Sequence, residues 1–355
     1  RQMCIRDRDS ATERVVEQRH PLGVVAAIVP WNYPLLLLAL KLAPALIAGN
    51  VVIAKPAPTT PLTTLMLGAL AADIFPAGVV QMLGDAGDVG PMLTAHRGIA
   101  HVSFTGSTAT GRRVMAAAAD TVKRFTLELG GNDPAILLDD ADVAAVAPIL
   151  FDGAMGNAGQ VCLGVKRIYA PRALVPALGA ALVACAERAV VGDGRVAGTT
   201  IGPVQNAAQY ARLVDLLAEV RAQGRVLHGG AAIEGSGYYI APTIVTDLPD
   251  AARLVQEEQF GPIIPLLAYD DEAELVRRVN DGPYGLGASV WTADAARGQA
   301  MAARIDSGLV WGNRLFEPPF DVPIGGAKQS GIGRHQGLAG VEEFTLIRIV
   351  NAALG

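Results

Sequence analysis

The stretch LGVVAAIVPWNYPLLLLALKLAPALIAGNVVIAK, residues 22–55, contains the pattern that decides the fold. A short β-branched run at 24–29 is followed by an apolar segment at 34–47 and a second β-branched run at 50–54. β-Branched residues favour strands, and a longer apolar segment that starts with proline favours a helix. Two strands joined by a helix form a βαβ unit, whose strands lie parallel in one sheet.

The same alternation continues to residue 127. The further strand-like runs are 79–83, 99–104 and 124–127, and the further helix-like segments are 61–74, 88–96 and 107–119. Thr60 is expected to cap the second helix, with Pro61 at its first position. Regular alternation of this kind predicts an α/β fold with a doubly wound parallel sheet. The β-branched runs disfavour the alternative, a helical bundle.

The pattern changes after residue 130. Three aspartates at 139, 140 and 142 precede an alanine-rich helix, and a glycine-rich segment follows at 153–164. Further βα alternation extends to about residue 310 and includes a helix at 271–280, acidic at its start and basic near its end. The second half is therefore predicted to form a separate α/β domain. The strand-like run at 345–350 is suited to pairing with another subunit.

Composition excludes several classes of protein. A chain of 355 residues suits two or three domains, and 51% hydrophobic residues suffice for a large core. The net charge of -5 gives no general attraction for nucleic acid or an anionic membrane. Its richest apolar stretch, 35–48, is broken by Lys41 and Pro44, which predicts a soluble protein. Three cysteines and no visible signal peptide indicate a reducing cytoplasm.

Two cysteines have contrasting surroundings. Cys162 lies in the polar, glycine-flanked sequence GQVCLG, whereas Cys185 lies within an apolar, alanine-rich segment. A free thiol is only a few per cent thiolate at neutral pH, so a nucleophilic cysteine needs help from its surroundings. Cys185 fits a small buried hydrophobic residue. Cys162 fits either that role or a nucleophile.

Two polar residues follow predicted strands, where doubly wound folds bind ligands. Glu128, in the sequence ELGG, is a candidate general base; the alternative is a solvated acid before a turn. Asn32 lies between Pro30 and Pro34 at the start of a predicted helix. Its amide suits an oxyanion donor, and a helix cap is the alternative.

The sequence GSTATG at 106–111 follows a strand and opens a helix, a favourable place for a phosphate group. It matches neither the dinucleotide fingerprint nor a P-loop. The lysines give a second clue, because the chain has only five against 24 arginines. A lysine retained against that bias suggests a need for a compact ammonium group, and Lys41 and Lys55 flank the possible cofactor region. Metal-ligand spacings and a GxSxG nucleophile motif are absent from the sequence.

Together these segments resemble the NAD(P)-dependent aldehyde dehydrogenase superfamily, from about His20 to the C-terminus. Eight segments carry the resemblance in order: Pro30-Trp-Asn-Tyr-Pro34, Gly49-Asn50 leading to Lys55-Pro56, Phe104-Thr-Gly-Ser107 with Gly111, Glu128-Leu-Gly-Gly131, Gly159-Gln-Val-Cys162, Glu257-Glu-Gln-Phe-Gly-Pro262, Asn280 with Tyr284-Gly-Leu286, and Pro323 through Gly333. Each segment is weak alone. Their common order and spacing make the resemblance specific.

The resemblance implies a Rossmann-like, dinucleotide-binding domain at 21–130, incomplete at its N-terminus, and an α/β catalytic thiol domain at 131–334. It also implies an N-terminal remnant at 1–20 and a C-terminal segment at 335–355, each with a candidate oligomerisation strand. Relatives carry a longer front, so the chain is expected to be truncated there. A homodimer or homotetramer is expected when that front is complete.

The same resemblance implies the reaction. Cys162 would attack an aldehyde carbon, and the Asn32 amide and the Cys162 N–H would hold the oxyanion. Hydride transfer to NAD or NADP would leave a thioester on Cys162. Glu128 would activate the water that releases the acid, and Lys41 matches a lysine discussed as a proton relay.

The resemblance also implies a set of cofactor contacts. Lys55 would contact the adenosine ribose, Ser107 the pyrophosphate and Glu258 the nicotinamide ribose. The remaining predicted cofactor-binding residues are Pro30, Trp31, Gly106, Gly111, Leu129 and Phe260, the last near the nicotinamide ring. Many NAD-preferring relatives have glutamate where this chain has Pro58, so we expect better use of NADP than in those relatives.

Two other classes of function stay open from the residues. A cysteine hydrolase would explain Cys162 but neither the βαβ half nor Ser107. A non-catalytic nucleotide-binding protein would explain the fold but not the combination of Cys162, Glu128 and Asn32.

Overall fold

A computed structural model describes residues 3–85, 87–316 and 319–354, with the backbone alone at 3–7 and 9. These residues divide into two units. The first contains residues up to 129 together with 319–325 and 331–354, and the second contains the described residues of 130–330 that lie outside those segments.

The first unit is built on a six-stranded sheet with the order β17-β7-β6-β3-β4-β5. Its strands are β3 (Val24–Ile28), β4 (Val51–Lys55), β5 (Val80–Met82), β6 (His101–Thr105), β7 (Arg124–Glu128) and β17 (Gly331–Ile332). The helices are α1 (Pro34–Ile47), α2 (Leu62–Ala72), α3 (Val89–Ala95), α4 (Thr108–Ala119) and α11 (Gly337–Glu342). All neighbouring strands are parallel except β17, which runs antiparallel to β7.

Alternate residues of β3 face opposite sides of this sheet. Val25 and Ala27 pack in a core with Leu38 of α1. Ala26 packs on the other side in a core that contains Val114 of α4. Because successive strand residues point to opposite faces, a strand covered by helices on both sides is apolar throughout. The predicted doubly wound parallel sheet is confirmed.

The connections reverse direction beside β3. From β3 the chain proceeds through α1 to β4, and it later returns through α3 to β6 on the other side of β3. Ligands of doubly wound sheets bind beyond the carboxyl ends of the strands at such a reversal. The segments that follow β3 and β6, residues 30–32 and 106–107, flank this point.

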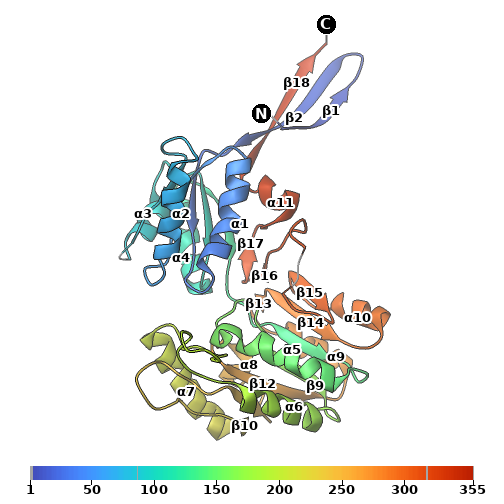
Figure 1. The fold of residues 1–355 in the computed structure, drawn as a ribbon. Coiled ribbons are helices and arrows are strands. Elements are labelled where there is room, and N and C mark those ends of the chain that lie inside the picture. Colours follow the sequence, from blue (N-terminus) through green and yellow to red (C-terminus); the bar gives the residue numbers. More distant parts are fainter. Residues whose placement is uncertain (1–2, 86, 317–318, 355) are drawn as a thin grey trace. The chain divides into compact units, whose positions relative to one another are not determined.

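A separate three-stranded antiparallel sheet has the order β1-β2-β18 (Figure 1). It contains β1 (Met3–Asp9), β2 (Glu13–Pro21) and β18 (Thr345–Ala353). The predicted strand at 345–350 is therefore present and is three residues longer. β18 is an edge strand, and its residues from Leu346 onward are exposed.

The second unit has a seven-stranded sheet with the order β10-β11-β12-β9-β8-β14-β15. Its strands are β8 (Pro134–Leu137), β9 (Arg167–Pro171), β10 (Arg225–His228), β11 (Thr243–Thr246), β12 (Ile263–Tyr269), β14 (Gly287–Trp291) and β15 (Leu309–Gly312), and β13 (Tyr284–Gly285) pairs separately with β16 (Ala327–Lys328). The helices are α5 (Val143–Met155), η1 (Gly156–Gly159), α6 (Val175–Arg188), α7 (Ala207–Gln223), α8 (Arg253–Gln256), α9 (Glu272–Asn280) and α10 (Ala295–Ala302). Two cores cover this sheet, one with Ile136 and α7, the other with Ala135, α5 and α6.

Two expectations differ from the structure. Thr60 does not cap α2: its N–H donates to the carbonyl of Ala57 in the preceding turn, and Pro61 occupies the N-cap position. The predicted catalytic domain runs without interruption to residue 334, whereas residues 319–325 and 331–334 belong to the first unit, where β17 pairs with β7. The helix at 143–155 begins as predicted, since Asp142 accepts hydrogen bonds from two of its first N–H groups.

Candidate functional site

Cys162 lies on a tight turn of the second unit. The N–H of Gly164 donates to the carbonyl of Val161 at 3.1 Å, which closes the turn around Cys162. Gln160 anchors the turn, because its side chain donates to the carbonyl of Asn157 and accepts the N–H of Gln205, both at 2.8 Å. Among the described residues Cys162 forms no disulfide, and it is half-buried. A fixed, partly accessible thiol is suited to act as a nucleophile.

The glycine pair at 130–131 brings Glu258 next to the Cys162 turn. A Cβ atom on Gly131 would lie 2.8 Å from the carbonyl oxygen of Cys162, closer than real Cβ atoms approach. The N–H of Gly131 donates to Oε1 of Glu258 at 3.1 Å, and a Cβ atom on Gly130 would collide with the same carboxylate. Both glycines are therefore required for this close approach.

Three ionisable side chains lie close together beside this turn. Burial raises the pKa of Glu258 and raises that of Asp133 well above its usual value, and the nearby charge of Lys166 opposes both shifts. The ring of Phe260 lies 5.6 Å from Nζ of Lys166. Cys162, Glu258 and Phe260, predicted from the sequence, thus belong to one cluster of the second unit. Sequence reasoning assigned no role to Lys166 or Asp133.

A second cluster lies in the first unit around Lys41. This lysine of α1 is completely buried. Its Nζ donates to Oγ1 of Thr105 at 2.8 Å and to Oγ of Ser103 at 3.3 Å, and it lies 3.4 Å from Nε2 of His335. Burial lowers the pKa of Lys41 to about 7, although the negative charge of Glu128 opposes the shift.

Glu128, at the end of β7, belongs to the same cluster. Only 13% of its side chain is exposed, so the alternative of a solvated acid is wrong. Burial raises its pKa to about 7, against the charges of Lys41 and Arg334. Its Oε1 lies 3.9 Å from Nδ1 of His335, whose pKa burial lowers well below the usual value. A carboxyl group with a pKa near neutrality can act as a general base.

His335 was missed by sequence reasoning. It follows the glycine-rich segment at the C-terminal side of β17 and is 2% exposed. No spacing in the sequence relates it to Lys41 or Glu128, since the three come from distant parts of the chain. An isolated histidine in a glycine-rich segment was the one available signal.

Lys55, at the end of β4, forms an ion pair with Asp85. Its Nζ lies 2.5 Å from Oδ2, and only 11% and 1% of the two side chains are exposed. The other oxygen of Asp85 accepts the N–H groups of Gly87, Asp88 and Val89 at 2.6, 2.8 and 3.0 Å. Although burial opposes ionisation, the hydrogen bonds from Lys55 and the backbone hold the pKa of Asp85 well below its usual value. Asp85 is a second residue that sequence reasoning missed.

The segment after β6 is held at the start of α4. Ser107 is the N-cap residue, and its Oγ accepts the N–H of Thr110 at 3.3 Å. The N–H of Gly106 donates to the carbonyl of Glu128 at 3.0 Å. Gly111 allows α4 to pack on Leu129, because a Cβ atom there would lie 2.5 Å from the leucine side chain.

The third predicted segment, Pro30, Trp31 and Asn32, connects β3 with α1. Tyr33 is the N-cap residue of α1 and no side-chain hydrogen bond caps this helix. The alternative role of Asn32 as a helix cap is therefore wrong.

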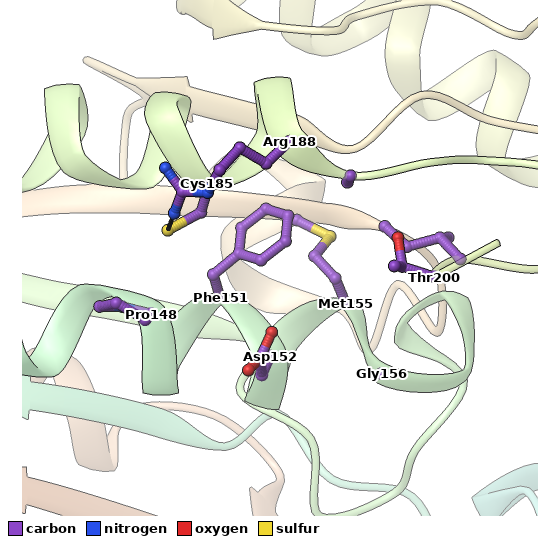
Figure 2. Close-up of a pocket in the computed structure, with 10 residues that line it drawn as sticks. Pro148, Phe151, Asp152, Met155, Gly156, Cys185, Arg188 and Thr200 are labelled. Atoms are coloured by element: carbon purple, nitrogen blue, oxygen red, sulfur yellow. Dashed lines mark hydrogen bonds between the residues drawn. The ribbon is translucent and has the colours of Figure 1, made fainter. Parts of the chain in front are cut away.

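Cys185 has the structural setting that its sequence predicts. It is 8% exposed and lies in α6, where its Sγ is 3.3 Å from the Arg188 guanidinium. Both residues line a surface pocket of about 430 Å³. Figure 2 shows Phe151 and Met155 of α5 on the opposite side of this pocket. Cys185 is thus held between two packed helices, unlike Cys162.

Comparison with known proteins identifies the family to which this chain belongs. The model of the aldehyde dehydrogenase family matches residues 3–350. The chain belongs to the aldehyde dehydrogenase family. The curated aldehyde dehydrogenase LUC3 of Fusarium sp is 41% identical over 342 residues, which are 96% of this chain and 72% of that protein.

Solved structures of similar enzymes have the same fold as this chain. A variant of aldehyde dehydrogenase C from Pseudomonas syringae, in complex with NAD+ and octanal, is 37% identical with a TM-score of 0.91, over 95% of this chain and 70% of that one. An NADP-dependent enzyme of E. coli is 35% identical with a TM-score of 0.95, over 100% of this chain and 74% of that one. The aldehyde dehydrogenase fold and the oxidation of aldehydes, predicted from the sequence, are confirmed. A hydrolase or a non-catalytic protein is not favoured.

The helices also bear on whether the chain spans a membrane. Across 3–85, 87–316 and 319–354, none combines the length and the apolar content that crossing a bilayer requires.

Proposed function

We propose that this member of the aldehyde dehydrogenase family oxidises an aldehyde to the carboxylic acid with NAD(P)+ through a covalent intermediate on Cys162. The observation that carries the proposal is the setting of Cys162: a half-buried thiol on an anchored turn, packed against Gly131 beside Glu258. Aldehyde dehydrogenase C of Pseudomonas syringae, which was crystallised with octanal, suggests aliphatic aldehydes as the first substrates to test.

The residues of the first unit fit a dinucleotide. Segments 30–32 and 106–107 flank the reversal point of a doubly wound sheet, and Lys55 supplies a largely buried ammonium at the end of β4. We assign Lys55 to the adenosine ribose and Ser107 to the pyrophosphate. The other proposed contacts are those of Pro30, Trp31, Gly106, Gly111, Leu129, Glu258 and Phe260. When bound, the nicotinamide ring accepts the hydride of the aldehyde carbon.

The protein groups divide the chemistry into two stages. In the first, the Cys162 thiolate attacks the aldehyde carbon, and the Asn32 amide and the Cys162 N–H stabilise the oxygen anion that forms. Loss of hydride leaves a thioester on Cys162. In the second, Glu128 takes a proton from water, and the resulting hydroxide attacks the thioester to release the acid and the thiolate.

The buried cluster around Glu128 suggests where that proton goes. If Lys41 is neutral it accepts a hydrogen bond from Nε2–H of His335, which leaves Nδ1 unprotonated and facing Glu128. The proton on Glu128 then moves to Nδ1 while the Nε2 proton moves to Lys41, whose pKa burial lowers to about 7. Lys41 and His335 are proposed as the proton relay of the second stage.

The choice between NAD and NADP depends on charge at the end of β4. Pro58 provides no carboxylate to repel a 2′-phosphate, and the Lys55–Asp85 pair has no net charge. We therefore propose that both cofactors are used, with NADP tolerated better than in relatives that carry glutamate at position 58.

The proposal extends to the assembly and the cellular location of the chain. β18 is an exposed nine-residue edge strand, which suits pairing with a second copy in a homodimer or homotetramer. Among the described residues Cys162 and Cys185 form no disulfide, which agrees with a cytoplasmic location.

The Cys162→Ala variant tests the proposal directly. NAD(P)H formation and acid production from octanal should both be lost in this variant. Cys185→Ala is the matched control and should retain them. Acid production by Cys162→Ala with either cofactor would refute the assignment.

A further inference from the structure

Lys166 is a completely buried cation beside the Cys162 turn, and the reaction proposed above does not use it. It immediately precedes β9 and is 1% exposed. Its Nζ donates to the carbonyl of Val161 at 2.5 Å and to the carbonyl of Gly159 at 3.2 Å. Burying an ammonium is costly, so its position next to this turn requires an explanation.

The carbonyl of Val161 and the N–H of Cys162 belong to the same peptide group. A hydrogen bond to a peptide oxygen polarises the amide and makes its N–H a stronger donor. A charged donor has a larger effect than a neutral one. Since the Cys162 N–H is a proposed oxyanion donor, the ammonium of Lys166 acts on that donor from the opposite end of one peptide.

Gly164 gives an independent observation on the same contact. A Cβ atom on Gly164 would lie 2.8 Å from Nζ of Lys166 and 3.0 Å from the carbonyl oxygen of Val161. Any larger residue at this position would displace the ammonium from the peptide. The turn is therefore built so that Lys166 reaches Val161.

The negative charges around Lys166 favour its protonated form. Burial lowers its pKa, and the negative charges of Glu258, Asp133 and the Cys162 thiolate oppose that shift. Arg167, which interacts electrostatically with Asp133, and Arg212, which does so with Glu258, are further cations nearby. Because a Coulomb interaction acts equally on both partners, the ammonium also stabilises the Cys162 thiolate.

We propose that Lys166 is a positioning residue for the aldehyde reaction, one that polarises the Val161–Cys162 peptide and holds the turn that carries the nucleophile. This inference rests on the proposed role of Cys162. It assigns to Lys166 an effect on the oxyanion and on the thiolate.

Substitution separates the donor from the charge. Lys166→Met removes both and should lower kcat about 10-fold or more, with little change in KM for the aldehyde, because removing an oxyanion donor outright costs about 10²–10³-fold. The pH profile of Cys162 alkylation by iodoacetamide should move to higher pH by about one unit. Lys166→Gln keeps a neutral donor, so kcat should recover partly while the alkylation profile stays shifted.

Lys123→Met is the matched control. Lys123 is also a buried lysine that donates to a backbone carbonyl, that of His96 at 2.7 Å, but it lies in the first unit. Its loss should leave kcat within about twofold and the alkylation profile unchanged.

Gly164→Ala tests the contact between Lys166 and Val161 without removing the lysine. It should lower kcat by displacing the ammonium, and should have little added effect in the Lys166→Met background, because both changes break one contact. Thermal denaturation of each variant verifies folding, and if Lys166→Met does not fold, Gly164→Ala is combined with Lys166→Gln instead. Wild-type kcat and alkylation profile in Lys166→Met or Lys166→Gln, or additive effects of Gly164→Ala, would overturn the role of Lys166. Activity of Cys162→Ala in the same assay would instead overturn the proposed function.

Discussion

The Nε2 atom of His335 lies 3.4 Å from the ammonium nitrogen of Lys41, inside the first unit. The other ring nitrogen faces Glu128 at 3.9 Å. If this arrangement moves the proton of the hydrolytic step, His335→Gln should lower kcat about 10–100-fold, less than the full effect of general acid–base catalysis. NAD(P)H should still form rapidly in the first turnover, since thioester formation precedes this step. Stopped-flow absorbance and steady-state kcat measure the two stages.

Removal of a histidine elsewhere is the control. His96→Gln changes an exposed residue whose contact is the nearby N–H of Gly98, and kcat should be unaffected. An equal loss in the first turnover and in the steady state of His335→Gln would contradict a role in hydrolysis alone.

The shifted pKa of Glu128 predicts a pH dependence. A general base works when it is deprotonated, so the hydrolytic rate should rise with pH through about 7, the pKa that burial gives Glu128. The positive charge of Arg334 favours the carboxylate. Arg334→Gln should therefore raise the pKa of Glu128 and move the rise to higher pH, by about one unit or less. A profile that moves to lower pH would contradict this assignment.

Cofactor preference should respond to the charge beside Lys55. Asp85→Asn keeps an oxygen for the three backbone N–H groups but leaves the ammonium of Lys55 unpaired, which attracts a 2′-phosphate. The ratio of kcat/KM for NADP to that for NAD should rise about 10-fold, which corresponds to about 1.4 kcal/mol. Pro58→Glu should lower the same ratio.

Asp88→Asn is the control for this change. Asp88 is an exposed carboxylate in the same loop, and its loss should alter the ratio less than twofold. A strong preference of the unaltered chain for NAD would contradict the expectation at Pro58. An unchanged ratio in Asp85→Asn would exclude Asp85 from cofactor discrimination.

Much of the fold was predictable because its signals are local. The alternation of β-branched runs with apolar helices set the parallel sheet of the first unit, and Asp142 marked the start of α5. Thr60 does not cap α2 because its N–H closes the turn at 57–60 instead. Residue type alone does not show which of the two arrangements forms. The membership of 331–334 in the first unit likewise depends on pairing between β17 and β7, which are distant in sequence.

The candidate site was predictable in part for the same reason. Cys162, Glu128 and Asn32 lie in short motifs whose residue types suggest their chemistry. Asp85, Lys166 and His335 carry no motif, and their partners come from other strands and loops. Packing determines which side chains form a buried ion pair and which lysine reaches a turn. The sequence alone shows only that few lysines are retained.

The edge strand β18 predicts how copies of the chain associate. Ile347 and Ile349 are 49% and 57% exposed and, two residues apart, lie on one face of the strand. Light scattering should give a mass that is a multiple of 36.8 kDa for the unaltered chain. The double variant Ile347→Lys with Ile349→Lys should give the monomer mass, since lysines on an edge strand oppose pairing with another chain. Leu62→Lys, at a residue that is 72% exposed outside this sheet, should leave the mass unchanged. A multimer that survives the double variant would show that the copies associate through another surface.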